Sequence, residues 1–337
     1  MTIKADFLRN LHPAYFAVVM ATGIISNDFF AMGNRLLSVG LFYVGIAAWL
    51  SLCVIFLSRA IFFSKEFRAD LTDAKVMFSF FTFVAGTGVL GVHLALESSV
   101  GLAKLFWVFS IVSWLPLTYL TFSVLTLKNS APIEQVANGG WLLLIVGTQS
   151  VSILTSYITG SFSGFEGWAI MLSLAIWGIG VVFYFIFIIL LVYRLSFFKV
   201  EPPDLAPPYW INMGAAAIST VAGTTLYSVI EGTGALSQFG GGVMLVSVVL
   251  WGWETWWLPL LFLFGFWRHF VKHYTLKYEP VMWSMVFVLG MYGKASWNLG
   301  TALEMQAFHT LATFMTWVAF AAWILVAVDL ILFPKAR

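Results

Sequence analysis

The chain has 337 residues, of which 61% are hydrophobic, 18% aromatic and 9% charged. Ordinary soluble domains carry about a quarter of their residues as charged side chains, so the composition excludes that class and indicates an integral membrane protein. The formal net charge of +2 is too small to indicate a nucleic-acid partner, and Cys53, the only cysteine, excludes internal disulfides and thiolate metal sites.

Apolar runs alternate with short charged or proline-rich segments along the whole chain. We therefore predict an all-α integral membrane protein with a single transmembrane domain at 12–333, a cytoplasmic N-terminus at 1–11 and a cytoplasmic C-terminus at 334–337. The first apolar run lacks the cleavage pattern of a signal peptide, so it is predicted to be a retained helix. The ten predicted spans cover residues 12–33, 36–58, 74–95, 102–127, 138–159, 166–193, 208–230, 241–267, 279–300 and 308–333.

Lysine and arginine are distributed unevenly between the two sides that these spans define. Fourteen of the 17 lie in the termini and the even-numbered loops, and only Arg35 and Lys104 lie in the odd-numbered loops. Positively charged loops tend to remain in the cytoplasm. The pattern predicts a multi-pass protein of the cell membrane with both termini in the cytoplasm, which requires an even number of spans.

Odd-numbered and even-numbered spans differ in composition. Gly, Ser, Thr, Asn and Gln make up 33 of 100 residues in windows of the odd spans and 20 of 120 in the even spans. Such residues permit close helix approach or face water, whereas lipid favours neither, so the odd helices are predicted inside and the even helices outside. Tight helix packing without any pore is the alternative explanation.

The ninth predicted span carries one full charge in its interior, Lys294. Seven residues separate Phe287 from Lys294, which is close to two helical turns, so the two share one face of the helix. Ser284 and Gly290 lie on or beside the same stripe. This face is predicted to line a passage with an aromatic ring, a gap and a cation.

The first predicted span repeats a feature of the ninth. Pro13 and Gly23 are separated by nine residues, as are the proline and glycine near the start of the ninth span. Aligning the two copies predicts that Met20, Gly23 and Asn27 face the same passage.

Lys294 needs either water or a partner, because an isolated charge inside a bilayer is costly. Asp28 on the first span and Glu254 on the eighth are expected at a similar depth. A cation that faces the passage would concentrate anions there, whereas a cation neutralised by Asp28 or Glu254 would be a structural clamp. Residue spacing leaves both possibilities open.

Other patterns have ordinary structural explanations. The segment 86–91 fits a nucleotide-binding glycine pattern, but it lies inside an apolar helix without a preceding strand. His269 and His273 share a face beside basic residues, which indicates a membrane rim rather than a metal site. The sequence contains no catalytic constellation, so we expect no enzymatic activity, no cofactor and no bound metal.

Three motifs carry a family resemblance. The segments HPAYFAVVMATGI at 12–24, WWLPLL at 256–261 with WRH at 267–269, and YEPVMWSMVFVLGMY at 278–292 resemble the tellurite-resistance/dicarboxylate transporter family, part of the slow-type anion channel superfamily. That family includes plant slow anion channels, yeast malate carriers and sulfite exporters. The resemblance implies five helical hairpins in a quasi-five-fold ring with the odd helices inside, a central anion path and a homotrimer.

The same resemblance assigns a pore gate to Phe287, because it matches the phenylalanine that blocks the path in the family. An aromatic constriction forms a dry barrier that an anion crosses only when the ring moves aside. Two residues depart from the family pattern. Val288 stands where relatives often have proline, and Lys294 stands where they have a small apolar residue, so gate geometry and selectivity are expected to differ.

The function predicted from these observations is an anion channel or transporter that conducts small inorganic or organic anions through a central pore. Its expected partners are membrane lipid, small anions and two further copies of the chain. A proton-coupled carrier of C4-dicarboxylates such as malate, or of sulfite, is the alternative within transport. A membrane scaffold or enzyme subunit without transport activity is the alternative from another class.

Overall fold

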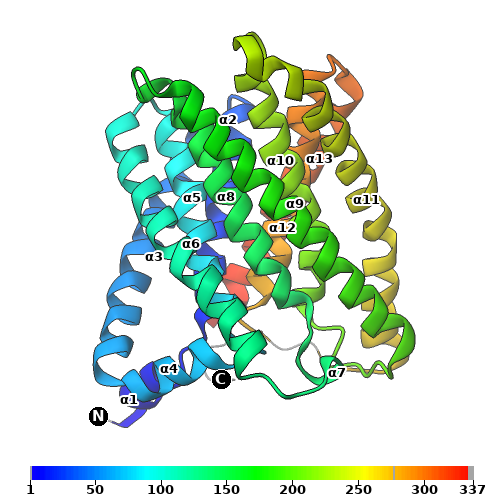
Figure 1. Ribbon diagram of the computed structural model, residues 1–337. Coiled ribbons are helices and arrows are strands. Elements are labelled where there is room, and N and C mark those ends of the chain that lie inside the picture. The colour runs from blue at the N-terminus through cyan, green and yellow to red at the C-terminus, as the bar shows by residue number, and fades with distance from the viewer. Residues whose placement is uncertain (1, 276–277, 333–337) are drawn as a thin grey trace.

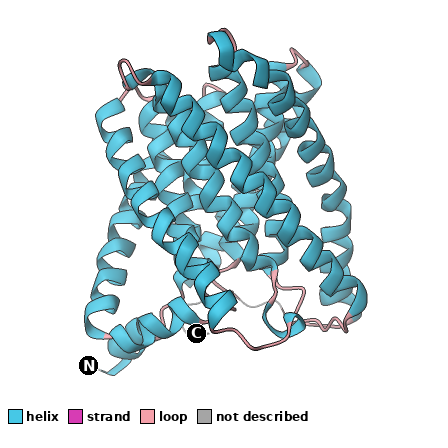
Figure 2. Cartoon of the chain, in the orientation of Figure 1, coloured by secondary structure: helices cyan, strands magenta, loops and turns pink. Residues whose placement is uncertain are grey.

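The computed structural model describes residues 2–275 and 278–332, and this part of the chain contains helices but no strands (Figure 2). The prediction of an all-helical protein is confirmed for these residues. The predicted C-terminal segment 334–337 and the end of the last predicted span lie outside them. The α-helices are α1 (Thr2–Arg9), α2 (Ala17–Ala31), α3 (Arg35–Phe62), α4 (Ser64–Thr72), α5 (Phe81–Leu96), α6 (Val100–Leu127), α7 (Ile133–Val136), α8 (Leu143–Ile158), α9 (Glu166–Phe197), α10 (Ile211–Ile230), α11 (Gly240–Phe266), α12 (Met282–Ala302) and α13 (Gln306–Leu332).

Nine helical segments in the described residues are long and apolar enough to cross a membrane. The helix of the ninth predicted span, α12, is outside this set although it has 21 residues. Its interior carries a lysine, an asparagine and two serines, which make it more polar than the others. The nine segments are Pro13–Ala31, Arg35–Phe62, Met77–Leu96, Val100–Leu127, Gly139–Ser161, Glu166–Phe197, Pro207–Ile230, Gly234–Val271 and Gln306–Leu330.

Burial divides these segments into two groups. The four that contain α2, α5, α8 and α10 bury between 78% and 94% of their most apolar stretch, whereas the other five bury between 17% and 39%. The alternation that the sequence predicted for these nine segments, odd inside and even outside, is therefore present in the structure. In Figure 1, α3 and α11 form opposite flanks of the bundle.

Each of the four buried segments begins with a short 3-10 turn before its α-helix. These turns are η1 (Pro13–Phe16), η2 (Met77–Phe80), η3 (Gly139–Leu142) and η5 (Pro207–Trp210). At η1, Pro13 occupies a position that needs no N–H, and the Nδ1 atom of His12 accepts the N–H of Ala14 at 3.1 Å. The turns place the start of every buried segment at one end of the bundle, where α1, α4 and α7 also lie (Figure 1). We call this the proximal end and the opposite one the distal end.

The buried helices pack in a closed series. Helix α2 contacts α5, α5 contacts α8, α8 contacts α10, α10 contacts α12, and α12 contacts α2 again. Glycines allow these close approaches, because an added Cβ at Gly88 would lie 3.0 Å from Ser150 and one at Gly214 would lie 2.3 Å from Val288. The backbones therefore surround a common centre.

Each peripheral helix is fixed to this inner group by an indole N–H. A tryptophan from each donates to an oxygen on a buried helix, which satisfies both polar groups inside the membrane. The five pairs are Trp49 with Thr87 Oγ1 at 2.9 Å, Trp114 with Thr148 Oγ1 at 2.8 Å, Trp177 with the Ser219 carbonyl at 3.0 Å, Trp251 with Ser296 Oγ at 3.0 Å and Trp323 with Thr22 Oγ1 at 2.9 Å.

Candidate functional site

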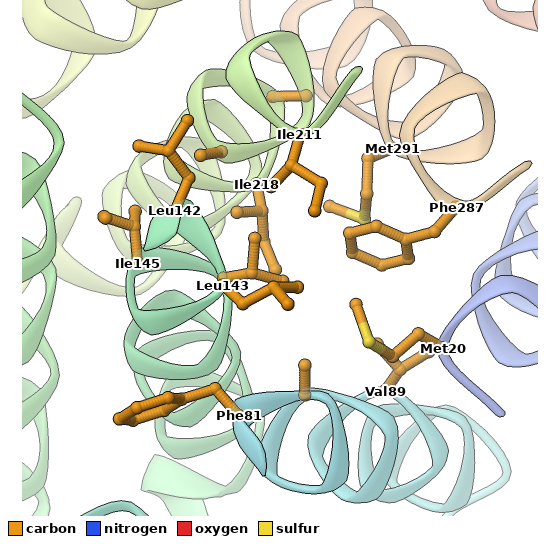
Figure 3. Close-up of a cluster of buried hydrophobic side chains, with 14 of the residues drawn as sticks. Met20, Phe81, Val89, Leu142, Leu143, Ile145, Ile211, Ile218, Phe287 and Met291 are labelled. Atoms are coloured by element: carbon orange, nitrogen blue, oxygen red, sulfur yellow. The ribbon is translucent and has the colours of Figure 1, made fainter. Parts of the chain in front are cut away.

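A layer of apolar side chains fills the centre of the inner helices toward the proximal end. Phe287 on α12 is 1% exposed, and its ring points toward the middle of the helices beside Met20 and Met291 (Figure 3). Leu143 from α8 and Ile211 from α10 point into the same space. We call Met20, Leu143, Ile211 and Phe287 the hydrophobic plug.

A small cavity lies in the centre of the bundle, and all five inner helices contribute to its wall. The space open to the centre of a water molecule is about 20 Å³, which is enough for about one water. Its lining consists of Ile24, Asn27, Gly88, Val89, Val92, Ser150, Ile153, Tyr157, Ile218, Val221, Met291 and Lys294.

A much larger space opens at the distal end of α8, α10 and α12. Its volume on the same measure is about 740 Å³, and it is lined by hydroxyl, amide and carboxylate side chains together with Lys294. We call this space the distal vestibule. Lys294 lines both the vestibule and the central cavity, so its side chain lies where the two spaces meet.

One face of α12 connects the three regions. Phe287, Met291, Lys294, Asn298 and Thr301 follow one another at steps of four, three, four and three residues, which is the spacing of a single helical stripe. Phe287 belongs to the plug, Met291 to the cavity, and Asn298 and Thr301 to the vestibule. An anion that moved along this face from the vestibule toward the plug would reach Lys294 first. The ring of Phe287 lies about 10 Å further along, since a helix rises 1.5 Å per residue.

The ammonium of Lys294 has no direct partner. The residue is 6% exposed and makes no hydrogen bond or ion pair with any residue in 2–275 or 278–332. Of the two carboxylates predicted as partners, Asp28 is the one on which Lys294 acts electrostatically. Asp28 is 3% exposed, and both of its carboxylate oxygens lack a hydrogen-bond partner among the described residues.

The second predicted partner, Glu254, has a different environment. It is completely buried on α11, near the phenol groups of Tyr184 and Tyr292. The structure therefore separates the two candidates, and the clamp that the sequence allowed between Lys294 and Glu254 is not formed.

The remaining residues predicted to line the passage have mixed positions. Gly290 lies against α2, because a Cβ added to it would be 2.8 Å from Ile24. Gly23 lies against α5, because a Cβ added to it would be 2.8 Å from Val89. These two glycines allow close packing between inner helices, and their place along the passage stays a prediction. Ser284 is 1% exposed and lines neither the cavity nor the vestibule.

Asn27 lines the central cavity, and its amide is held by α5. Its Nδ2 donates to the carbonyl of Val89 at 3.1 Å, and its Oδ1 lies 2.9 Å from Nδ1 of His93. His93 is completely buried, and its Nε2 lies 3.8 Å from Glu97. His93 and Glu97 are four residues apart in the sequence, which contains no signal for the contact between His93 and Asn27.

Sequence reasoning missed Met291 and the vestibule residues Asn298 and Thr301. The signal was present, because extending the stripe of Phe287 and Lys294 by further helical steps reaches all three. Several polar residues of α8 instead hold helices together, as Gln149 does by donating to the Trp177 carbonyl at 3.2 Å.

Comparison with known proteins agrees with this architecture. The sequence profile of the voltage-dependent anion channel family matches residues 10–331. An uncharacterized membrane protein of Mycobacterium tuberculosis is 39% identical over 134 residues, which are 40% of this chain and 68% of that protein.

Two relatives align with almost the whole chain. An uncharacterized transporter of Methanocaldococcus jannaschii is 23% identical over 327 residues, which are 95% of this chain and 92% of that protein. A sulfite efflux pump of Trichophyton rubrum is 22% identical over 349 residues, which are 95% of this chain and 89% of that protein. The resemblance predicted from the sequence motifs is confirmed, and the chain belongs to the voltage-dependent anion channel family.

Proposed function

We propose that this protein conducts small inorganic or organic anions across the cell membrane through a central pore between α2, α5, α8, α10 and α12. The observation that carries the proposal is Lys294, a buried cation that has no direct partner among the described residues and lines both the central cavity and the distal vestibule. A cation in this position raises the local concentration of anions and offsets the cost of removing their water.

In this proposal Phe287 is the gate. The support is its position in the hydrophobic plug and its place on the same stripe as Lys294, two turns away (Figure 3). A dry apolar layer blocks ions, and rotation of one ring toward α2 or α10 would open it. Val288 stands where relatives often have proline, and it packs against Gly214 on α10. This contact holds α12 against α10 by side-chain packing.

The proposed topology has ten spans, with α12 as the ninth, arranged as a quasi-five-fold ring of hairpins. The closed series of contacts among the inner helices supports the ring, and the five indole hydrogen bonds support the hairpin order. Basic residues at the proximal end, among them Arg59 paired with Asp70 and Arg194 paired with Asp204, support a cytoplasmic location of that end and of both termini.

Two transport modes remain candidates. The sulfite efflux pump among the relatives favours sulfite as one substrate, and the carboxylate of Asp28 beside Lys294 favours a carrier that binds a proton with the anion. A passive channel would give a reversal potential that follows the anion gradient alone. A proton-coupled carrier of sulfite or of a dicarboxylate such as malate would give one that also shifts with the pH gradient.

Flux measurements in liposomes test the proposal. Purified protein should accelerate the entry of at least one of chloride, nitrate, sulfite and malate, and Lys294→Met should reduce that entry. Correctly inserted protein that transports none of them would leave a non-transporting membrane scaffold or enzyme subunit as the function. We further propose a homotrimer in lipid, as the family resemblance implies, which native mass spectrometry from nanodiscs tests.

A further inference from the structure

The distal vestibule contains an arrangement of donors and charges that the proposed pore by itself does not require. Lys294 is the only cation among the described residues that line it, and two carboxylates, Glu231 and Glu304, line it as well. Both glutamates are exposed near the mouth, whereas Lys294 is 94% buried at the floor. An entering ligand therefore passes two negative charges before it reaches one positive charge.

Next to the cation lies a preorganised pair of neutral donors. Asn298 is one helical turn beyond Lys294 on α12, and its Nδ2 donates to Oγ1 of Thr224 at 3.2 Å and of Thr225 at 3.4 Å on α10. Thr224 passes its own proton to the carbonyl of Thr220 at 2.8 Å. The hydroxyl proton of Thr225 is donated to no acceptor in the described chain, so it is free for a ligand.

Residues four apart on a helix have Cβ atoms about 6 Å from each other, so Lys294 and the Asn298–Thr225 pair border a space a few ångströms wide. An anion with two or three oxygen atoms fits this spacing, because one oxygen can accept from the ammonium while another accepts from the Thr225 hydroxyl, which Asn298 holds in place. A spherical halide reaches only one side at a time. The donor set thus favours a planar or pyramidal oxyanion.

We propose that Lys294, Asn298 and Thr225 form a recognition site for a monovalent oxyanion, such as a monocarboxylate, nitrate or hydrogensulfite, and that Glu231 and Glu304 discriminate against divalent anions. The role of this site in transport rests on the proposed function. A second negative charge on the ligand would find no further cation in the vestibule and would lie nearer to the two glutamates. Like charges that face each other across a confined space reduce both entry and binding.

Flux selectivity is the first test. In liposomes at neutral pH, the wild-type protein should transport formate at least about tenfold faster than succinate, which carries two charges under these conditions. The double variant Glu231→Gln/Glu304→Gln should raise succinate flux relative to formate, while Asn298→Leu should lower the ratio of formate flux to chloride flux. Equal rates for formate and succinate, or an unchanged ratio in the double variant, would overturn this proposal and leave the anion pore intact.

The second test measures binding without transport, so that a failure of the recognition site can be distinguished from a failure of the proposed transport function. Because Cys53 is the only cysteine, Cys53→Ser removes all thiols, and Thr301→Cys then places one reporter in the vestibule. Formate should slow modification of this thiol by an anionic methanethiosulfonate reagent and leave a neutral reagent unaffected. Adding Lys294→Met should abolish the protection.

Ser237→Cys provides the matched control, because this residue is exposed on η6 (Gly234–Phe239) at the same end of the bundle and does not line the vestibule. Formate should leave its modification unchanged. Absence of protection at position 301 with folded protein, or protection that survives Lys294→Met, would refute the recognition site whether or not the protein transports anions.

Discussion

Asp28 on α2 and Lys294 on α12 interact electrostatically across the contact between their helices, although neither oxygen of Asp28 accepts a hydrogen bond from a described residue. Gly290 lets α12 approach α2 closely here, since a Cβ there would lie 2.8 Å from Ile24 and in ordinary contact, at 3.5 Å, with Oδ2 of Asp28. The carboxylate lowers the cost of holding the lysine in the membrane without occupying its donors. The ammonium therefore remains available to a ligand.

Removal of this carboxylate should strengthen the binding of anions. In Asp28→Asn the side chain beside Lys294 can no longer carry a negative charge, so the anion concentration that gives half-maximal flux should fall by about tenfold, which corresponds to about 1.4 kcal/mol. Concentration-dependent flux in liposomes measures the change. If Asp28→Asn instead prevents folding and Asp28→Asn/Lys294→Met restores it, the pair is a structural clamp.

Replacement of the cation should have the opposite effect. Lys294→Met keeps an unbranched side chain only one atom shorter and removes the charge, so anion flux at low concentration should fall by about tenfold or more. Lys294→Arg keeps the charge and should retain most of the activity. Equal flux in the wild type and in correctly inserted Lys294→Met would show that the cation does not contribute to conduction.

Shortening the proposed gate should open the plug. Phe287→Ala removes the ring from the centre of the bundle, so single-channel or macroscopic anion current should rise by about tenfold or more. Phe81→Ala is the matched control, because Phe81 is also fully buried but points away from the centre toward Gly147 (Figure 3). Equal currents from these two variants would argue against a gating role for Phe287.

Close backbone packing at the proximal end should be intolerant of a single methyl group. A Cβ at Gly139 would lie 2.2 Å from the carbonyl oxygen of Pro208, so Gly139→Ala must separate η3 from η5 and should lower the free energy of unfolding by about 1–3 kcal/mol. Gly160, at the other end of the same buried segment, has nothing within 4 Å, and Gly160→Ala should change stability by less than about 0.5 kcal/mol. Thermal unfolding in detergent compares the two, and equal melting temperatures would contradict the packing argument.

The indole hydrogen bonds between peripheral and inner helices should contribute individually small amounts. A double-mutant cycle of Trp251→Phe and Ser296→Ala should give a coupling energy of about 0.6 kcal/mol, the average for such bonds inside membranes. Unfolding of the four proteins in mixed micelles provides the measurement. A coupling of zero would mean that this bond does not hold α11 against α12.

The sequence by itself determined the class of protein, the positions of the helices and the division of nine spans into buried and exposed ones. Composition excluded a soluble protein, and the excess of small and polar residues in odd spans marked the buried helices, because lipid tolerates neither extra polarity nor packing gaps. Helical spacing also placed Phe287 and Lys294 on one stripe. These properties depend on local patterns that each segment carries independently of its neighbours.

Only the tertiary structure decided which way each stripe faces. Gly290 and Met291 are adjacent in sequence, yet one packs against α2 and the other lines the cavity, because the rotation of α12 about its axis is set by contacts with α2 and α10. Which of Asp28 and Glu254 lies near Lys294 depends on the same rotation of α12. Helical periodicity defines which residues share a face, but close packing between helices distant in sequence determines what that face meets.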